Sequence, residues 1–416
     1  MTTSNSPPTL AFTLPAGAPS AAKATLKLLL RLKHGTITVK LPDGSVHRFG
    51  SAKSNSQAPQ ASLHLLNWNV CSAALKSGDI GFAESYIAGD WTTPHLTELL
   101  QVFILNRKEV EDVIYGTWLG RLAYRVKHML NRNTKANSQK NIHAHYDLGN
   151  AFYELWLDDT MNYSSAIFDS PETSMQDAQH AKVRRALRMA HVKPGDRVLE
   201  IGCGWGALAE KATQEFNANV VGVTLSTEQL DWANQRMARG GVLDKVDLRL
   251  QDYRDIGKTT QDAPFDAICS IEMVEAVGQQ YWPEYFQTVH RLLKPGGYAC
   301  IQSIVIADDL FERYVTSTDF IQQYVFPGGC LPCPKAFRAQ AAAAGLEMVD
   351  EFSFGQDYAR TLQQWREKFA AQQAYVLQLG FDQRFIRIWE FYLSYCEAAF
   401  LQANTDVVQY TLRKPA

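Results

Sequence analysis

Short apolar runs alternate with amphipathic stretches through the second half of the chain. The apolar runs have the composition of buried strands and cover Val198–Ile201, Val220–Val223, Val246–Leu250, Phe265–Ser270 and Tyr298–Ser303. Helical periodicity covers residues 207–216, 227–239, 273–277 and 281–293 between them. Because such alternation is typical of parallel sheets covered on both faces, we predict a Rossmann-like α/β domain. Ligands of these sheets bind outside the carboxyl ends of the strands.

The segments on either side of this region predict a small N-terminal domain and a C-terminal helical cap. Residues 36–41 alternate apolar and polar side chains and lead into a turn at 42–44, which predicts a hairpin. A polar linker at 51–59 and helical patterns at 63–106 complete a small N-terminal α+β domain without chemistry of its own. Residues 334–400 are helical in pattern and rich in aromatic residues. They predict a helical cap whose aromatic side chains mostly form a core and in part line a tunnel.

These patterns divide the chain into four parts. Residues 1–22 contain no Lys or Arg and are rich in Ser, Pro, Thr and Ala, so we expect a disordered tail without the charged start of a signal peptide. We assign the accessory domain to residues 23–130, a basic linker to 131–145, and the Rossmann-like domain with its cap to 146–416.

The run from Arg197 to Leu208 predicts a strand that enters a helix through a glycine-rich turn. Its glycines, Gly202, Gly204 and Gly206, lie two residues apart, whereas dinucleotide-binding turns place the last glycine three residues after the second. The spacing therefore argues against NAD. A turn preceded by an acid, Glu200, suits a zwitterionic nucleoside without phosphates, and S-adenosylmethionine is the commonest such ligand. Taken alone, the turn is also compatible with a tight connection that binds nothing.

Composition and charge narrow the classes of function. The net charge of -2 gives no reason to expect a nucleic-acid partner, and the apolar fraction of 46% is that of a well-packed protein. Seven scattered cysteines indicate reduced thiols rather than a disulfide framework. Cys330 and Cys333 form a single C-x-x-C pair without a second pair or a nearby His, so we predict no metal site.

The segment from Val113 to Tyr146 contains no acidic residue. Its basic residues are Arg121, Arg125, Lys127, Arg132, Lys135 and Lys140. This composition is typical of an amphipathic helix that lies on anionic lipid headgroups, and equally of a core helix whose basic flank leads into a linker. No run of the chain approaches 18 apolar residues. We therefore expect a soluble, cytoplasmic protein that contacts the inner face of the membrane from its surface.

Seven segments together carry a resemblance to a known family. They cover residues 145–150, 161–168, 200–206, 222–226, 251–255, 272–278 and 324–332. In this order they resemble the cyclopropane fatty acid synthases, an S-adenosylmethionine-dependent family that includes mycolic acid cyclopropanating and methylating enzymes. The resemblance implies a class I methyltransferase sheet and unsaturated phospholipid acyl chains as substrates, while the anionic membrane surface is a partner expected from the basic segment. It is also compatible with a homodimer.

The resemblance implies a set of residues that contact the cofactor. They are Tyr163, Ser164, Gly202, Gly204, Gly206, Thr224, Gln229, Asp252 and Tyr253. Thr224 and Gln229 replace the acid that many methyltransferases direct at the ribose hydroxyls, and both side chains form hydrogen bonds with hydroxyls. Asp252 and Tyr253 are expected to flank the adenine.

The resemblance also implies a reaction and a base. A cis double bond attacks the sulfonium methyl, a base removes a proton from the transferred methyl, and a cyclopropane ring closes. Family members hold bicarbonate as that base, and the matching positions here are Ser165, Glu275, Gln302, Ile304 and Tyr358. Ser165 stands where Cys is usual, and Gln302, where His occurs, fits a second branch that includes plant-like enzymes.

Three alternatives stay open at this point. Glu272, three residues before Glu275, is a candidate protein base that would make bicarbonate unnecessary. Methyl transfer to the double bond leaves a carbocation on the acyl chain. A methyltransferase that quenches this carbocation in another way would produce a methyl-branched or methylene acyl chain. A non-catalytic lipid-binding protein would retain the fold without the reaction.

Overall fold

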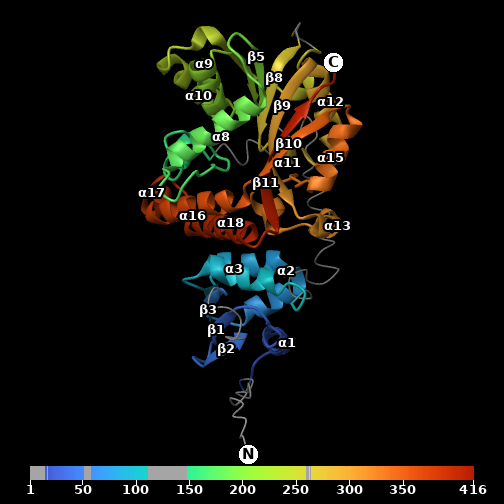
Figure 1. The fold of residues 1–416 in the computed structure, drawn as a ribbon. Coiled ribbons are helices and arrows are strands. Elements are labelled where there is room, and N and C mark those ends of the chain that lie inside the picture. The colour runs from blue at the N-terminus through green and yellow to red at the C-terminus, as the bar shows by residue number, and fades with distance from the viewer. Residues whose placement is uncertain (1–14, 16, 51–57, 111–147, 259–261, 263) are drawn as a thin grey trace, which may run out of the picture. The chain divides into compact units, whose positions relative to one another are not determined.

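The computed structural model describes residues 15, 17–50, 58–110, 148–258, 262 and 264–416 (Figure 1). The chain divides into two compact units, residues 1–121 and 122–416. The expected amphipathic helix and the whole of the expected basic linker lie outside the described residues.

Within its described residues, the N-terminal unit is a four-stranded sheet with three helices. The sheet order is β2-β1-β3-β4, with β1 (Thr36–Lys40) antiparallel to β2 (Val46–Gly50) and parallel to β3 (Gln60–Leu65), and β3 antiparallel to β4 (Trp91–Thr92). The helices are α1 (Ser20–Leu29), α2 (Asn69–Ala88) and α3 (Leu96–Leu105). The predicted hairpin is present.

The predicted boundaries of two segments in this unit were wrong. The strand β3 extends into the stretch that begins the helical prediction, because its apolar residues alternate with a period of two and its buried positions face the small core. Helix α1 begins inside the expected tail, and Ala22 there is fully buried. The folded part therefore starts before residue 23.

The C-terminal unit is built on a seven-stranded sheet of order β10-β11-β9-β8-β5-β6-β7. Its strands are β5 (Arg197–Ile201), β6 (Asn219–Thr224), β7 (Val246–Leu250), β8 (Phe265–Ile271), β9 (Leu293–Ile306), β10 (Glu347–Ser353) and β11 (Thr405–Arg413). The strands from β9 to β7 are parallel, whereas β10 and β11 are antiparallel to their neighbours. All five predicted strands are present, and β9 (Leu293–Ile306) begins five residues before the predicted strand at Tyr298.

Helices cover both faces of this sheet (Figure 1). One face packs against α8 (Met175–Met189), α9 (Ala207–Phe216) and α10 (Thr227–Arg239). The other face packs against α11 (Val274–Val277), α12 (Trp282–Leu292) and α15 (Pro334–Ala343). This is the two-sided arrangement that the sequence predicted.

The cap lies across one end of the sheet (Figure 1). It consists of α16 (Gly355–Ala371), α17 (Gln373–Gln378) and α18 (Gln383–Leu401), and α13 (Asp308–Thr316) and α14 (Phe320–Tyr324) add short segments beside β9. The ring of Phe152, in α7 (Asn150–Glu154), contacts Trp156, Phe369 and Trp389, and all four side chains are buried. Aromatic packing therefore ties residues 150–156 to the cap.

Two further features bear on the expectations from the sequence. Within the described ranges, no helix is long and apolar enough to cross a membrane, and no three metal-ligating side chains gather. Cys330 is buried in the main core, and Cys333 Sγ accepts a hydrogen bond from Ala336 N at the start of α15. Cys330 therefore contributes to core packing, and Cys333 contributes to the start of helix α15.

Candidate active site

The glycine turn after β5 has a backbone that favours glycine at three positions. Gly202, Gly204 and Gly206 have φ angles of +83°, +51° and +82°. Gly202 N donates to Val223 O at 3.0 Å, which fastens the turn to β6. A Cβ at Gly204 would meet no atom within 4 Å, so this glycine leaves open space for a ligand against the backbone.

Gly206 differs from the other two glycines. A Cβ there would lie 3.0 Å from Ala233 Cβ of α10, and Gly206 does not line the adjoining pocket. Gly206 therefore allows α9 to pack closely against α10, and its expected contact with the cofactor stays a prediction.

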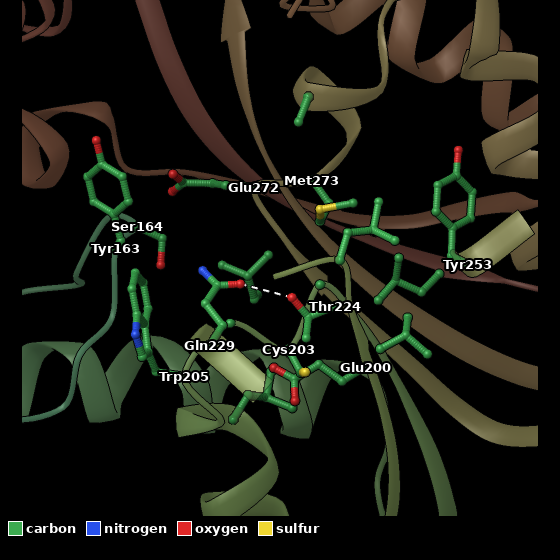
Figure 2. Close-up of a pocket in the computed structure, with 18 of the residues that line it drawn as sticks. Tyr163, Ser164, Glu200, Cys203, Trp205, Thr224, Gln229, Tyr253, Glu272 and Met273 are labelled. Carbon is green, nitrogen blue, oxygen red and sulfur yellow. Dashed lines mark hydrogen bonds between the residues drawn. The ribbon is translucent and has the colours of Figure 1, made fainter. Parts of the chain in front are cut away.

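A pocket opens beside the turn, at the carboxyl ends of the strands (Figure 2). The other eight residues expected to contact the cofactor all line it: Tyr163, Ser164, Gly202, Gly204, Thr224, Gln229, Asp252 and Tyr253. Figure 2 shows Tyr163 on one side of the pocket and Tyr253 on the other. The fold thus brings together residues that are up to 90 positions apart in the chain.

Hydrogen bonds fix several polar groups of this pocket. Thr224 Oγ1 donates to Gln229 Oε1 at 2.9 Å (Figure 2), which leaves the amide N–H groups of Gln229 available to a ligand. The buried Lys182 donates from Nζ to Ser164 Oγ at 2.6 Å. Asp252 forms an ion pair with Arg254, with 2.5 Å between Oδ2 and the guanidinium.

Glu200 supplies a buried acid beside the turn. Burial raises the pKa of this carboxyl to about 8, and within the described part of the chain its Oε2 has no hydrogen-bond partner. A ligand ammonium would satisfy that oxygen and restore the charged form. The open space at Gly204, the amide of Gln229 and this acid together fit S-adenosylmethionine.

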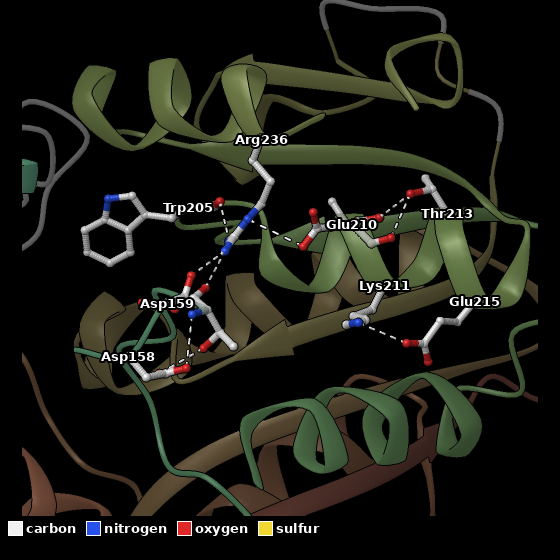
Figure 3. Close-up of polar contacts among 10 residues, drawn as sticks. Asp158, Asp159, Trp205, Glu210, Lys211, Thr213, Glu215 and Arg236 are labelled. Carbon is white, nitrogen blue, oxygen red and sulfur yellow. Dashed lines mark hydrogen bonds and ion pairs between the residues drawn. The ribbon is translucent and has the colours of Figure 1, made fainter. Parts of the chain in front are cut away.

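A buried arginine holds the turn in place (Figure 3). Arg236 of α10 donates to Trp205 O at 3.0 Å and to Thr160 O at 2.8 Å, and it pairs with Glu210 at 3.5 Å. It therefore links the glycine turn to the segment that leads into Tyr163. This residue was not predicted from the sequence, because an arginine near a helix end usually faces solvent.

A second, mainly apolar pocket adjoins the first. Its walls come from the end of β9, from residues 314–331 and from the cap helices α16 and α18. Tyr163, Glu272 and Ala276 line both pockets. Glu272 therefore lies where a ligand on the glycine turn would meet a ligand in the apolar pocket.

Glu272 follows β8 in a left-handed backbone conformation, with a φ of +53°. Its Oε1 accepts from Ser165 N at 2.9 Å and from Gln302 Nε2 at 2.8 Å, and its Oε2 accepts from the Tyr358 hydroxyl at 2.7 Å. Non-glycine residues adopt this conformation rarely, and such strain gathers at functional sites. The strained backbone directs the carboxyl of the half-buried Glu272 toward three converging donors.

Glu275 accepts a hydrogen bond from the remaining donor of the expected bicarbonate site, the backbone N–H of Ile304. Ile304 N donates to its Oε1 at 3.0 Å and Ser303 Oγ to its Oε2 at 3.3 Å. Burial, and then the charge of Glu272, raise the pKa of Glu275 to about 8. Burial also raises the pKa of Glu272, but its three donors and the charge of Lys182 oppose that rise. We therefore place the negative charge on Glu272 and a proton on Glu275.

These contacts correct the expected bicarbonate site. Ser165 N, Gln302 and Tyr358 already donate to Glu272, and the Ser165 hydroxyl donates to Ala166 O instead of facing the pocket. A bicarbonate ion would meet buried carboxyl groups in place of free donors. The residues present therefore do not fit bicarbonate.

Comparison with known proteins places this site in a family. A family model for mycolic acid cyclopropane synthetase matches residues 133–410. The chain belongs to this family. Its similar relatives include both cyclopropane synthases and fatty acid methyltransferases.

Two relatives match nearly the whole chain. Tuberculostearic acid methyltransferase UfaA1 of Mycobacterium tuberculosis is 36% identical over 408 residues, which cover 96% of this chain and 92% of that protein. The cyclopropane-fatty-acyl-phospholipid synthase of Escherichia coli K12 is 32% identical over 378 residues, which cover 89% and 94%.

A solved structure supports the fold assignment. Mycolic acid cyclopropane synthase CmaA1, complexed with SAH and CTAB, superposes with a TM-score of 0.61 at 31% identity, over 66% of this chain and 98% of that one. The cyclopropane synthetase family and this likeness establish an S-adenosylmethionine-dependent methyltransferase with a class I fold.

Proposed function

We propose that this enzyme transfers a methyl group from S-adenosylmethionine to a cis double bond of a phospholipid acyl chain, and that Glu272 then removes a proton so that a cyclopropane ring closes. The observation that carries the proposal is the position of the Glu272 carboxylate, which lines both the pocket at the glycine turn and the apolar pocket. An acyl chain suits the apolar pocket because the walls are mostly aromatic and aliphatic.

The reaction balances with this chain's residues. When bound, S-adenosylmethionine supplies an electrophilic methyl group. The alkene electron pair forms the new carbon–carbon bond as the methyl leaves sulfur, and a cation remains on the acyl chain. Glu272 takes a proton from the new methyl, and the released C–H electron pair closes the ring. The proton is then on the Glu272 carboxyl.

The surroundings of Glu272 prepare it for this role. Its three donors stabilise the carboxylate, and that charge in turn stabilises a cation formed in the adjoining apolar pocket. Glu275, with its pKa raised to about 8, stays protonated at neutral pH and does not compete for the proton. The apolar pocket excludes water that would otherwise quench the cation.

A second candidate product has the same first step. If a hydride shifts before the proton is lost, the same base yields a methylene-branched chain. The 36% identity to tuberculostearic acid methyltransferase UfaA1 over nearly the whole chain favours this candidate. The non-catalytic alternative is not supported, because the hydrogen-bonded Glu272 carboxylate and the cofactor pocket are both present.

Product analysis tests the proposal. We expect lipids from cells that express the protein to gain one CH2 per modified chain, with loss of the original double bond. The ring and the methylene product have the same mass, so proton NMR is needed to distinguish ring methylene protons from vinylidene protons. Cells that carry the Glu272→Gln variant are the control. Unchanged lipids in cells with the wild-type protein would contradict the proposed reaction.

We also propose that the enzyme reaches its substrate by peripheral association with an anionic membrane surface. The support is the acid-free composition of residues 113–146, since each Lys or Arg near such a surface contributes about 1 kcal/mol. We expect sedimentation with anionic liposomes to fall steeply as salt is added. Equal sedimentation with neutral and anionic vesicles would refute the electrostatic argument.

A further inference from the structure

A chain of hydrogen-bonded side chains connects Glu272 to Arg185 of α8. Gln302 of β9 donates from Nε2 to Glu272 Oε1 at 2.8 Å, and its Oε1 accepts from Gln409 Nε2 of β11 at 3.0 Å. Gln409 Oε1 in turn accepts from Arg185 of α8 at 2.8 Å. Gln302 and Gln409 are opposite one another in the β9–β11 ladder, and both are fully buried.

Arg185 and Glu272, at the two ends of this series of hydrogen bonds, set the orientation of the Gln409 and Gln302 amides. An arginine guanidinium only donates hydrogen bonds, so Gln409 must turn its oxygen to Arg185 and its N–H groups to Gln302. Gln302 must then accept with its oxygen and donate to Glu272. Gln409 Nε2 also donates to Lys182 O at 3.2 Å, which favours the same orientation.

Arg185 itself is held firmly although it lies toward the surface. Its second guanidinium nitrogen donates to Asp350 of β10 at 2.8 Å, and its guanidinium carbon lies 4.2 Å above the ring of Phe352. The Arg185 side chain is 19% exposed. A fixed cation thus stands at the outer end of the chain of amides.

We propose that Arg185 is a positioning residue that, through Gln409 and Gln302, fixes an N–H group on Glu272 and so stabilises the carboxylate form of the base. This inference rests on the proposed function of Glu272. With Gln302 reversed, an amide oxygen would face the carboxylate and favour the protonated, inactive form.

Other charged and titratable groups also act on Glu272. They are Tyr358 of α16, which donates to Oε2, Lys182 of α8, whose charge favours the carboxylate, and Glu275 of α11, on the same segment. Each of these groups acts on Glu272 directly and not through Gln302 and Gln409. The effect of a substitution at Arg185 is expected to reach Glu272 through the hydrogen bonds of these two amides.

The test is the pH dependence of kcat in purified full-length variants. In Gln409→Glu, residue 409 only accepts, so Gln302 must turn its N–H toward it and its oxygen toward Glu272. We expect the acid limb of the profile to move up by about one pH unit. This shift corresponds to a loss of about tenfold in kcat in the pH range where Glu272 titrates. Arg185→Met should move it in the same direction by less, because Lys182 O still attracts the Gln409 N–H.

The matched control is Arg184→Met. Arg184, the neighbouring residue of α8, pairs with Glu215 and does not contact the amide chain. We expect this variant to keep the wild-type profile. A loss of turnover at all pH values in Arg185→Met and Gln409→Glu, with the acid limb unmoved, would mean a merely structural role and overturn the inference. Full turnover in Glu272→Gln would instead refute the proposed base, so the two failures are distinguishable.

Discussion

Glu272→Gln is expected to bind S-adenosylmethionine with wild-type affinity and to lose turnover by about 10²- to 10⁴-fold, the usual contribution of a general base. The fold should survive, because an amide at this position still accepts from Ser165 N and Gln302 with its oxygen and donates to the Tyr358 hydroxyl. Calorimetry measures cofactor binding, and a lipid methylation assay measures turnover.

Two controls sharpen this result. Glu215→Gln, which changes a carboxylate that pairs with Arg184 outside both pockets, should keep wild-type turnover. Wild-type enzyme in bicarbonate-depleted buffer should also keep its turnover, because the donors that would hold the ion already donate to Glu272 and Glu275. A sharp loss that added bicarbonate restores would contradict the assignment of the base to Glu272.

Gly204→Val is expected to weaken S-adenosylmethionine binding roughly ten- to hundredfold, since forcing extra side-chain atoms into an occupied site costs about 1–3 kcal/mol. A side chain at this position meets no protein atom within 4 Å and would enter the space beside the turn. The variant should remain folded, with binding measured by calorimetry and stability by thermal unfolding.

The control for this variant is Gly241→Val. Gly241 has a φ of +66°, its Cβ would also meet no atom within 4 Å, and it lies outside the cofactor pocket. It carries a similar backbone strain of about 1–2 kcal/mol, so both variants should lose similar stability while only Gly204→Val loses affinity. Equal affinity in the two variants would show that the ligand does not approach the turn.

The parallel core of the fold was predictable because strands β5, β6 and β8 bury nearly continuous apolar runs and the helices between the strands are amphipathic. Strands β5 to β8 and helices α9 to α12 lie within one or two residues of their predicted ranges. The strands β10 and β11 were missed for different reasons. β10 is a polar edge strand, and β11 carries Gln409 and Thr411 in the sheet interior, where an apolar pattern was expected.

The site was only partly predictable. The resemblance named the donors Ser165, Gln302 and Tyr358, but the group they bind depends on the side-chain direction of Glu272, which a left-handed φ sets. No periodicity in the sequence reveals such an angle. Lys182 was missed because a lysine in an amphipathic helix is ordinarily assigned to the solvent face.

The left-handed backbone at Glu272 has a consequence for how the enzyme tolerates mutation. A glycine at this position would relieve the backbone strain, about 1–2 kcal/mol, but would leave Ser165 N, Gln302 and Tyr358 without their acceptor. A glutamine would keep an acceptor for these donors and lose only the base. Selection for heat resistance alone would therefore tolerate glutamine at this position, and variants chosen only for their melting temperature would include folded but inactive proteins.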